Sequence, residues 1–273
     1  MKQQPIGIFD SGYGGLTVLK EIEARLPQYD YIYLGDNARS PYGTRSFETV
    51  YEYTLECVKW LFEQDCPLVI LACNTASAKA LRTIQQNDLS QIGEEKRILG
   101  VIRPTTEIIG KFTKTGEVGI LATTGTVLSN SYPIEIKKFY PEVRVLQEAC
   151  PMWVPLVENN EYNSPGADHF IRKNINNLLS RSGGIDTILL ACTHYPLLIE
   201  KIRKNVPAGV TILSQGEIVA NSLVTYLEKH PGIEAKCSKN GKISLYTTDS
   251  PMDFDDHAAV FYGKPVKSVH LSL

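Results

Sequence analysis

The sequence lacks several features that mark particular classes of protein. Its 273 residues contain no C-x-x-C pair, and the formal net charge at pH 7 is only −2. No apolar run approaches the length of about 20 residues that spans a bilayer. A nearly neutral chain has no strong field to attract nucleic acid or an anionic lipid surface. We therefore expect neither a nucleic acid nor a membrane as a partner.

The cysteines also lack the paired spacing of a disulfide framework. Six of them are spread along the chain, as is typical of reduced thiols in a cytoplasmic enzyme. The segment 1–10 has only a few apolar residues, so we expect no signal peptide and a cytoplasmic location. The cysteines that we interpret as structural or incidental, because they lack the strand-end context described below, are Cys57, Cys66, Cys150 and Cys237.

Two nucleotide-binding motifs are absent as well. Gly12 and Gly14 fit the start of G-x-G-x-x-G, but Thr17 occupies the position of the third glycine, and no G-x-x-x-x-G-K-[ST] motif occurs. The glycine loop still precedes a predicted helix, where backbone N–H groups can face an anion. A small carboxylate suits this loop better than a pyrophosphate does. The alternative is a loop that only turns the chain sharply.

What the sequence does contain is ordinary for a globular protein, with 43% hydrophobic and 21% charged residues,. At roughly 150 residues per domain, the length predicts one or two domains. Short apolar runs alternate with segments of helical spacing, which is typical of parallel sheets. We expect strands at 6–9, 31–34, 68–72, 99–102, 117–122, 143–146, 187–191, 210–213 and 243–248. We expect helices at 16–26, 47–62, 76–81, 105–112, 132–140, 168–179, 217–227 and 254–262, and another that opens at 197–199. We expect a loop or a short helix end at 85–96, a loop at 150–158 and an exposed polar segment at 236–242.

Sequence motifs in the first part of the chain recur later, which predicts two related halves. The loop Asp10-Ser11-Gly12 after the first strand has an echo in Thr123-Thr124-Gly125. We therefore expect an α/β fold of two similar, doubly wound parallel-sheet lobes, with the active site in the cleft between them. The expected first lobe comprises residues 1–98 and 213–273, and the expected second lobe comprises residues 99–212.

The clearest repeat is a strand end that carries a thiol. One apolar run ends in Ala72-Cys73-Asn74-Thr75, and the other ends in Ala191-Cys192-Thr193-His194. In open α/β sheets, functional residues gather beyond the carboxyl ends of the strands. The repeat predicts one thiol from each lobe, facing a shared cleft. Two buried structural cysteines are the alternative, because free cysteine is among the most buried residue types.

Two facing thiols suit proton transfer at a single carbon. One, as thiolate, removes a proton, and the other, as thiol, returns a proton to the opposite face and inverts the carbon without a cofactor. An unperturbed cysteine thiol has a pKa of about 8.5, so each thiol needs a neighbouring group that assists its ionisation. His194 could assist Cys192, or it could be bonded only to local backbone. Asp10 could neighbour Cys73. Because a carboxylate raises the pKa of a nearby thiol by like charge, Asp10 would act there as an orienting hydrogen-bond partner or as a proton acceptor.

Short polar side chains beside both cysteines are candidates for substrate binding. Asn74, Thr75 and Thr193 could contact a substrate carboxylate and ammonium group, although the same residue types are favoured as simple helix N-caps. We expect no metal site. The spacing in Cys192-Thr193-His194 is too short for the usual zinc pairs, and no second pair completes four ligands.

Five phrases, in this order, resemble those of the glutamate racemases, which belong to the cofactor-independent Asp/Glu racemase family. The resemblance covers nearly the whole length. The phrases are Ile8-Phe9-Asp10-Ser11-Gly12-x-Gly14-Gly15-Leu16, Pro41-Tyr42-Gly43, Ala72-Cys73-Asn74-Thr75-Ala76, Val154-Pro155-Leu156-Val157-Glu158 and Cys192-Thr193-His194-Tyr195-Pro196.

This resemblance implies an enzyme that interconverts L- and D-glutamate without a cofactor and supplies D-glutamate for peptidoglycan. It implies a homodimer, as in many members. It also implies that Cys73 and Cys192 are the acid/base residues, assisted by Asp10, His194 and Glu158. The substrate contacts that it implies are Asp10, Ser11, Tyr42, Gly43, Asn74, Thr75, Thr193 and His194.

Three positions depart from the family pattern, and three other functions stay open. Arg103, Ala191 and Ser214 stand where an acid, glycine and aspartate are common, which bears on regulation, lobe motion or the interface. No long N-terminal extension is seen, so we do not expect the regulation linked to it. The alternatives are a racemase of aspartate or another amino acid, a cysteine amidohydrolase that uses Cys192 with His194, and a non-catalytic amino-acid sensor.

Overall fold

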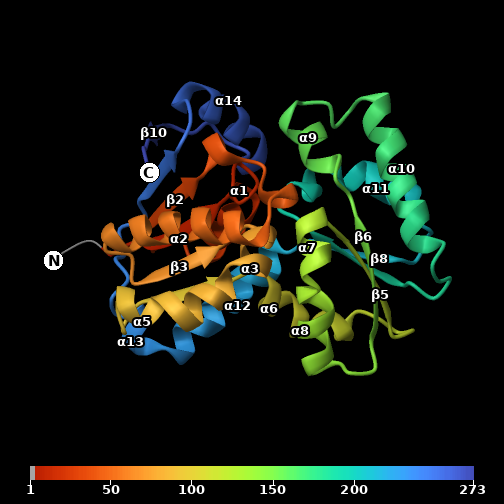
Figure 1. Cartoon of the computed structure of the whole chain (residues 1–273), viewed down its shortest axis with the longest axis horizontal. Helices are drawn as coiled ribbons and strands as arrows, with labels where there is room; N and C mark the ends of the chain where they lie inside the picture. The colour runs from red at the N-terminus through yellow and green to blue at the C-terminus, as the bar shows by residue number, and fades with distance from the viewer. Residues whose placement is uncertain (1–3) are drawn as a thin grey trace.

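Two separate sheets, each with all its strands parallel, organise the computed structural model, which describes residues 4–273. Figure 1 shows them in two lobes, with the red and orange start of the chain and its blue end in one lobe and the green middle in the other. Both ends of the chain therefore belong to the same lobe. Within residues 4–273, no helix has the length and apolar character that a membrane span requires.

The first sheet has six strands. In spatial order they are β10 (Ser268–His270), β9 (Ile243–Thr247), β2 (Tyr31–Gly35), β1 (Ile6–Asp10), β3 (Leu68–Leu71) and β4 (Arg97–Gly100). The central strands β1 and β3 are buried throughout, as their continuous apolar sequences predict for a parallel sheet covered on both faces. β1 pairs directly with β3, which brings Asp10 next to the segment that carries Cys73.

Helices cover both faces of this first sheet because its side chains alternate between them. Ile6 and Ile8 join the apolar cluster under α1, α12 and α14, whereas Phe9 joins the cluster under α2 and α3. The helices of this lobe are α1 (Leu16–Arg25), α2 (Phe47–Glu63), α3 (Asn74–Lys79), α4 (Leu81–Thr83), α5 (Leu89–Ile92), α12 (Gly216–Lys229), α13 (Pro231–Glu234) and α14 (Pro251–Tyr262). Short 3₁₀ turns at Asn37–Arg39 and Tyr42–Thr44 and a π-helical turn at Ile84–Asp88 complete the lobe.

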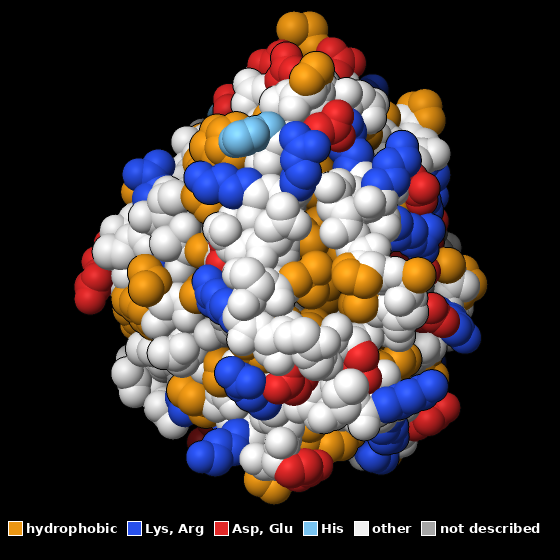
Figure 2. Space-filling model, turned by 90° about the vertical axis from the view of Figure 1, so that its right-hand side faces the viewer, with side chains coloured by type: hydrophobic (Ala, Val, Ile, Leu, Met, Phe, Trp, Pro, Cys, Tyr) orange, Lys and Arg blue, Asp and Glu red, His pale blue; other side chains and the backbone are white. Residues whose placement is uncertain are grey.

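The second sheet has four strands, and it too is covered on both faces. Their order is β6 (Arg144–Ala149), β5 (Glu117–Ala122), β7 (Thr187–Ala191) and β8 (Thr211–Leu213). The helices are α6 (Ile102–Thr106), α7 (Thr124–Ser129), α8 (Ser131–Phe139), α9 (Trp153–Glu158), α10 (Pro165–Leu179) and α11 (Ile199–Asn205), with 3₁₀ turns at Ile109–Lys111 and Tyr195–Leu198. On the outer face of this lobe, charges of both signs are scattered among uncharged atoms (Figure 2).

The predicted fold class is confirmed, and so is the return of the C-terminal segment to the first sheet, where β9 pairs with β2. The sheets differ slightly from the expected division at 98/99 and 212/213. Leu99 and Gly100 belong to β4 of the first sheet, and Leu213 belongs to β8 of the second. The division into two lobes at those residues stays a prediction.

Several predicted elements are wrong in detail. The strand expected at 99–102 ends at Gly100, and the helix expected at 105–112 is split into α6 and a 3₁₀ turn. The segment 150–158 is not a loop, because its end forms α9, and Pro155 lies in the first turn, where a missing N–H costs nothing,. The segment 85–92 is helical, which is one of the two forms expected for it. The short α13 and β10 were not expected, since three or four residues give too little periodicity to recognise.

The core of the second lobe provides a direct test of this fold. Leu189 in β7 is 0% exposed and packs in the cluster formed with α6 and α8, whereas Leu128 in α7 is 69% exposed. Leu189→Ala should lower the free energy of unfolding by about 2–5 kcal/mol, because it removes buried apolar contacts and leaves a cavity. Leu128→Ala should change it by less than about 0.5 kcal/mol. Urea unfolding followed by circular dichroism measures both, and equal losses would contradict the packing described here.

Candidate active site

The carboxyl ends of strands from both sheets meet at one pocket between the lobes. Cys73 follows β3 of the first sheet, Cys192 follows β7 of the second, and both line this pocket. Glu158, at the end of α9, lies in the same wall. The other predicted residues that line it are Ser11, Tyr42, Gly43, Asn74, Thr75, Thr193 and His194.

Cys73 is held by its own helix and by the loop after β1. It is the N-cap of α3, and its Sγ accepts a hydrogen bond from the Ala76 N–H at 3.4 Å. Sγ in turn donates a hydrogen bond to the Ser11 hydroxyl oxygen, also at 3.4 Å. Burial, followed by the nearby Asp10 carboxylate, raises the pKa of the Cys73 thiol to about 12. The thiol is therefore protonated at neutral pH.

Cys192 is followed by a buried histidine that connects it to a carboxylate. Sγ of Cys192 lies 3.9 Å from Nδ1 of His194, and Nε2 of His194 lies 3.0 Å from Oε1 of Glu158. Burial alone would lower the pKa of His194, but the bonds to Cys192 and Glu158 outweigh it and raise this pKa to about 10. His194 is therefore an imidazolium at neutral pH, and its positive charge stabilises negative charge on the Cys192 sulfur.

Asp10 lies beneath the pocket rather than in its wall. Its side chain is 0% exposed, and neither carboxylate oxygen has a hydrogen-bond partner among residues 4–273. Burial raises the pKa of Asp10 to about 6, although the charge of His194 acts in the opposite direction. A buried, unpaired carboxylate is costly, so Asp10 favours the arrival of a positively charged group.

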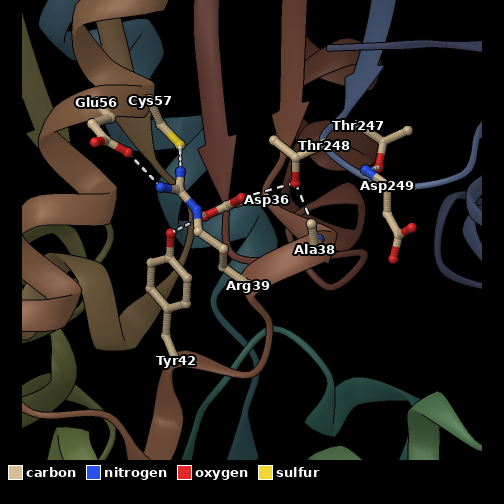
Figure 3. Close-up of polar contacts among 9 residues, drawn as sticks. All are labelled: Asp36, Ala38, Arg39, Tyr42, Glu56, Cys57, Thr247, Thr248 and Asp249. Atoms are coloured by element: carbon tan, nitrogen blue, oxygen red, sulfur yellow. Dashed lines mark hydrogen bonds and ion pairs between the residues drawn. The ribbon is translucent and has the colours of Figure 1, made fainter. Parts of the chain in front are cut away.

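The predicted contact loop at Tyr42 and Gly43 is fixed by a buried carboxylate that the sequence did not single out (Figure 3). Asp36 follows β2 and accepts hydrogen bonds from the Tyr42 hydroxyl, from Arg39 Nε at 2.7 Å and from the Thr248 hydroxyl at 2.8 Å. Arg39 also forms an ion pair with Glu56 of α2. The loop that walls the pocket is thus tied to α2 and to the segment after β9.

Asn74 and Thr75 do not have the free side chains that a simple contact role would suggest. Thr75 shares a 3.0 Å hydrogen bond with Thr123 of the second lobe. The Asn74 amide donates to Gln215 at 2.8 Å, and its oxygen accepts from the Tyr132 hydroxyl at 2.6 Å. Neither residue caps a helix, since the N-cap of α3 is Cys73 itself. Both side chains connect the two lobes.

The glycine loop after β1 approaches the second lobe so closely that it has no room for a side chain. A Cβ at Gly14 would lie 2.2 Å from the Thr193 hydroxyl oxygen and 2.4 Å from Nδ1 of His194. Thr17 donates a hydrogen bond to the Thr193 carbonyl at 3.0 Å. The loop therefore needs glycine to dock against the segment after Cys192, whatever small anion it also meets.

The sequence interpretation missed several pocket residues. Thr123 and Thr124 line the pocket, and their signal was the echo of Asp10-Ser11-Gly12 at a strand end. Cys150 was set aside as lacking a strand-end context, which is wrong: it follows β6 directly and lines the pocket. Burial, and next the charge of Glu148, hold its thiol pKa well above the usual range. The remaining missed residues are Ser40, Pro41, Thr44, Pro151, Val154 and Pro155.

The arrangement offers two sulfur atoms with different neighbours, one from each lobe, in a pocket with hydroxyl and amide donors. An imidazolium flanks one sulfur, and a protonated thiol provides the other. Such a pair can remove a proton from one bound carbon and supply a proton to it. The polar groups between them suit a small ligand that carries a carboxylate and a cationic group.

Comparisons with known proteins agree over the length of the chain. The family model of the Asp/Glu/Hydantoin racemases matches residues 11–223. A glutamate racemase from Geobacter metallireducens is 41% identical over 254 residues, which cover 93% of this chain and 91% of that protein.

Solved structures show the same relation. A glutamate racemase isoform from Bacillus anthracis superposes with a TM-score of 0.90 at 34% identity and covers 100% of this chain and 99% of its own. A glutamate racemase from Francisella tularensis in complex with D-glutamate gives a TM-score of 0.86 at 29% identity, covering 100% and 98%. By its sequence, its fold and the match of nearly its whole length, the chain belongs to the Asp/Glu/Hydantoin racemase family.

Proposed function

We propose that this protein is a glutamate racemase that interconverts L- and D-glutamate by cofactor-independent proton transfer between two cysteines. The observation that carries the proposal is that Cys73 and Cys192, from different lobes, line one pocket. Because the pocket lies between the lobes, a substrate bound there can have a sulfur on either side of its α-carbon. Inversion requires this placement, since the proton must leave one face and return to the other.

In one direction of the racemisation, Cys192 is the base and Cys73 is the acid. The His194 imidazolium, 3.9 Å from Cys192 Sγ, supports the thiolate there, and Glu158 holds the imidazole by its other nitrogen. Cys73 remains a thiol, because burial and Asp10 raise its pKa to about 12. After Cys192 removes the α-proton, Cys73 can donate its proton to the opposite face.

In the reverse direction, Cys73 must become the thiolate, and the substrate itself helps. The ammonium group of glutamate would approach the unpaired Asp10 carboxylate and balance its charge. That removes the like-charge repulsion that Asp10 exerts on the Cys73 sulfur. Hydroxyl and amide groups of Ser11, Thr75 and Thr193 would hold the carboxylate, on which negative charge grows as the proton leaves.

Glutamate is proposed over aspartate because the relatives that match the full length are named glutamate racemases, one of them solved with D-glutamate bound. D-Glutamate made in this way would supply peptidoglycan biosynthesis in the cytoplasm, where reduced thiols persist. We propose a homodimer on the same family grounds.

One other function has a specific observation in its favour. The chain of contacts from Cys192 through His194 to Glu158 has the form of a nucleophile, a base and an orienting acid, as in cysteine hydrolases,. That function gives Cys73 no role. Incubation with L-glutamate in deuterated water distinguishes the two. Loss of optical rotation with uptake of deuterium at the α-carbon supports the racemase, ammonia release would support an amidohydrolase, and an unchanged substrate would support a sensor.

The roles of the two sulfurs are tested by Cys73→Ala and Cys192→Ala. Each variant should lose racemisation by a factor of about 10³ or more, because one face of the carbon loses its acid or base. Any α-proton exchange that remains should be confined to one enantiomer, and the two variants should select opposite enantiomers. Proton NMR in deuterated water measures both quantities.

The matched control is Cys237→Ala, which removes a buried thiol of the first lobe that lies outside the pocket and donates a hydrogen bond to the Ile233 carbonyl at 3.4 Å. It should racemise at close to the wild-type rate. A Cys73→Ala or Cys192→Ala variant that turned over both enantiomers at near-normal rates would refute the two-base mechanism.

The charge of His194 is tested by Glu158→Gln. His194 has a folded-state pKa of about 10, raised from 6.5, so its proton stabilises the fold fully below pH 6.5 and that contribution is lost as the pH rises through 10. Removing the Glu158 charge should lower the His194 pKa by about one unit or more. The stabilisation from this proton should then be smaller, and its loss should be complete at a lower pH.

Titration of the His194 ring proton by NMR measures this shift, and urea unfolding between pH 6 and 10 measures its effect on stability. In the His194→Asn background, Glu158→Gln should no longer change the pH dependence of unfolding. An unchanged His194 midpoint in Glu158→Gln would mean that the carboxylate does not set the charge of the histidine.

A further inference from the structure

Three buried side chains form a closed ring of hydrogen bonds beside the pocket. Asn74 Nδ2 donates to Gln215 Oε1 at 2.8 Å, Gln215 Nε2 donates to the Tyr132 hydroxyl at 2.8 Å, and that hydroxyl donates to Asn74 Oδ1 at 2.6 Å. All three residues are buried. Within the ring, each member gives one hydrogen bond and receives one.

The direction of the ring is fixed by a backbone carbonyl, which can only accept. Gln215 Nε2 lies 3.1 Å from the Val101 carbonyl oxygen, so this atom must be the nitrogen of the amide. Gln215 Oε1 then has to accept from Asn74, and Asn74 must present its nitrogen to Gln215 and its oxygen to Tyr132. The alternative orientation of the Asn74 amide would place its oxygen against Gln215 Oε1, so that two acceptors would face each other.

The ring leaves one hydrogen of Asn74 unused. A primary amide has two N–H groups, and in residues 4–273 Nδ2 of Asn74 has a single acceptor, Gln215. Asn74 lines the pocket, between Cys73 and Thr75. A buried N–H without an acceptor costs about 1–3 kcal/mol, so the free N–H favours a ligand that brings an acceptor.

We propose that Tyr132 and Gln215 are positioning residues, which lock the Asn74 amide so that its free N–H donates to the carboxylate of the substrate. This inference rests on the proposed function for the identity of the carboxylate. Neither residue lines the pocket, so both act through Asn74. No sequence pattern indicates this role, since a lone tyrosine in a helix and a lone glutamine before one match no motif.

The three members of the ring come from three parts of the fold. Asn74 begins α3 of the first lobe, Tyr132 lies in α8 of the second, and Gln215 is the N-cap residue of α12, where the chain returns to the first lobe. The amide of Asn74 is thus oriented by contacts that exist only when the lobes are assembled as described. Its donor strengthens as negative charge grows on the substrate carboxylate during proton removal.

Tyr132→Phe removes the hydroxyl and keeps the buried ring. Phenylalanine cannot donate to Asn74 Oδ1, so the Asn74 amide should lose its fixed orientation, and kcat/KM for glutamate should fall about 10-fold, or about 1.4 kcal/mol. Tyr140→Phe is the matched control. The Tyr140 hydroxyl donates to the Glu107 carbonyl at 2.9 Å, in the same lobe but outside the pocket, and kcat/KM should stay within about twofold of wild type.

A double-mutant comparison separates positioning from general structural support. In the Asn74→Ala background, Tyr132→Phe should cause no further loss, because the group through which it acts is gone. Gln215→Met, which keeps the volume and removes both polar atoms, should show the same dependence on Asn74. An equal fold-loss with and without Asn74 would overturn the proposal.

The side-chain amide signals of Asn74, observed by nitrogen-edited NMR, provide a readout that does not depend on turnover. Tyr132→Phe should shift both N–H signals, and Tyr140→Phe should shift neither. Unmoved Asn74 signals in Tyr132→Phe would overturn the proposal even in an active enzyme. A wild-type protein that did not racemise glutamate would overturn the proposed function instead, and the Asn74 signals would still decide whether Tyr132 orients this amide.

Discussion

Exclusion of water from the charged groups around two sulfur atoms is the constraint on which the site depends. Asp10, Cys73 and His194 are all buried, so their charges are balanced by one another, by Glu158 or by a ligand rather than by water. Burial raises the pKa of Asp10 to about 6 and contributes to a Cys73 pKa of about 12, while Cys192 and Glu158 raise that of His194 to about 10. The two thiols are chemically alike, and their surroundings make them different.

The rest of the fold holds these surroundings in place. Parallel strands bring the ends of β1, β3 and β7 to the pocket, and helices seal both faces of each sheet. The close approach of Gly14 to the segment after Cys192 leaves no space for a side chain between the two loops. Asp36 fixes the opposite wall through Tyr42. The polar side chains of the pocket are therefore held by buried contacts from both lobes.

Local patterns in the sequence predicted much of this structure, whereas the rest depends on contacts between segments that are far apart in the chain. The strand ends at Cys73 and Cys192 were recognisable because an apolar run followed by small polar residues is a local signal. The sequence allowed Asp10 to neighbour Cys73, and the pairing of β1 with β3 brings the two segments together. By contrast, Asp36 gains its role from Thr248, more than two hundred residues away. The roles of Tyr132 and Gln215 could not be predicted for the same reason. The helix α9 was missed because Pro155 suggested a loop.

The chain crosses between the two sheets twice, and the two crossings touch. The first passes through Val101, after β4, and the second passes through Gln215, after β8, and a 3.1 Å hydrogen bond joins them. The intervening segment therefore leaves and re-enters the first lobe at a single place, as an inserted module does. Such a module could be exchanged between relatives, or excised and its flanks rejoined by a short linker, without breaking a strand of the six-stranded sheet.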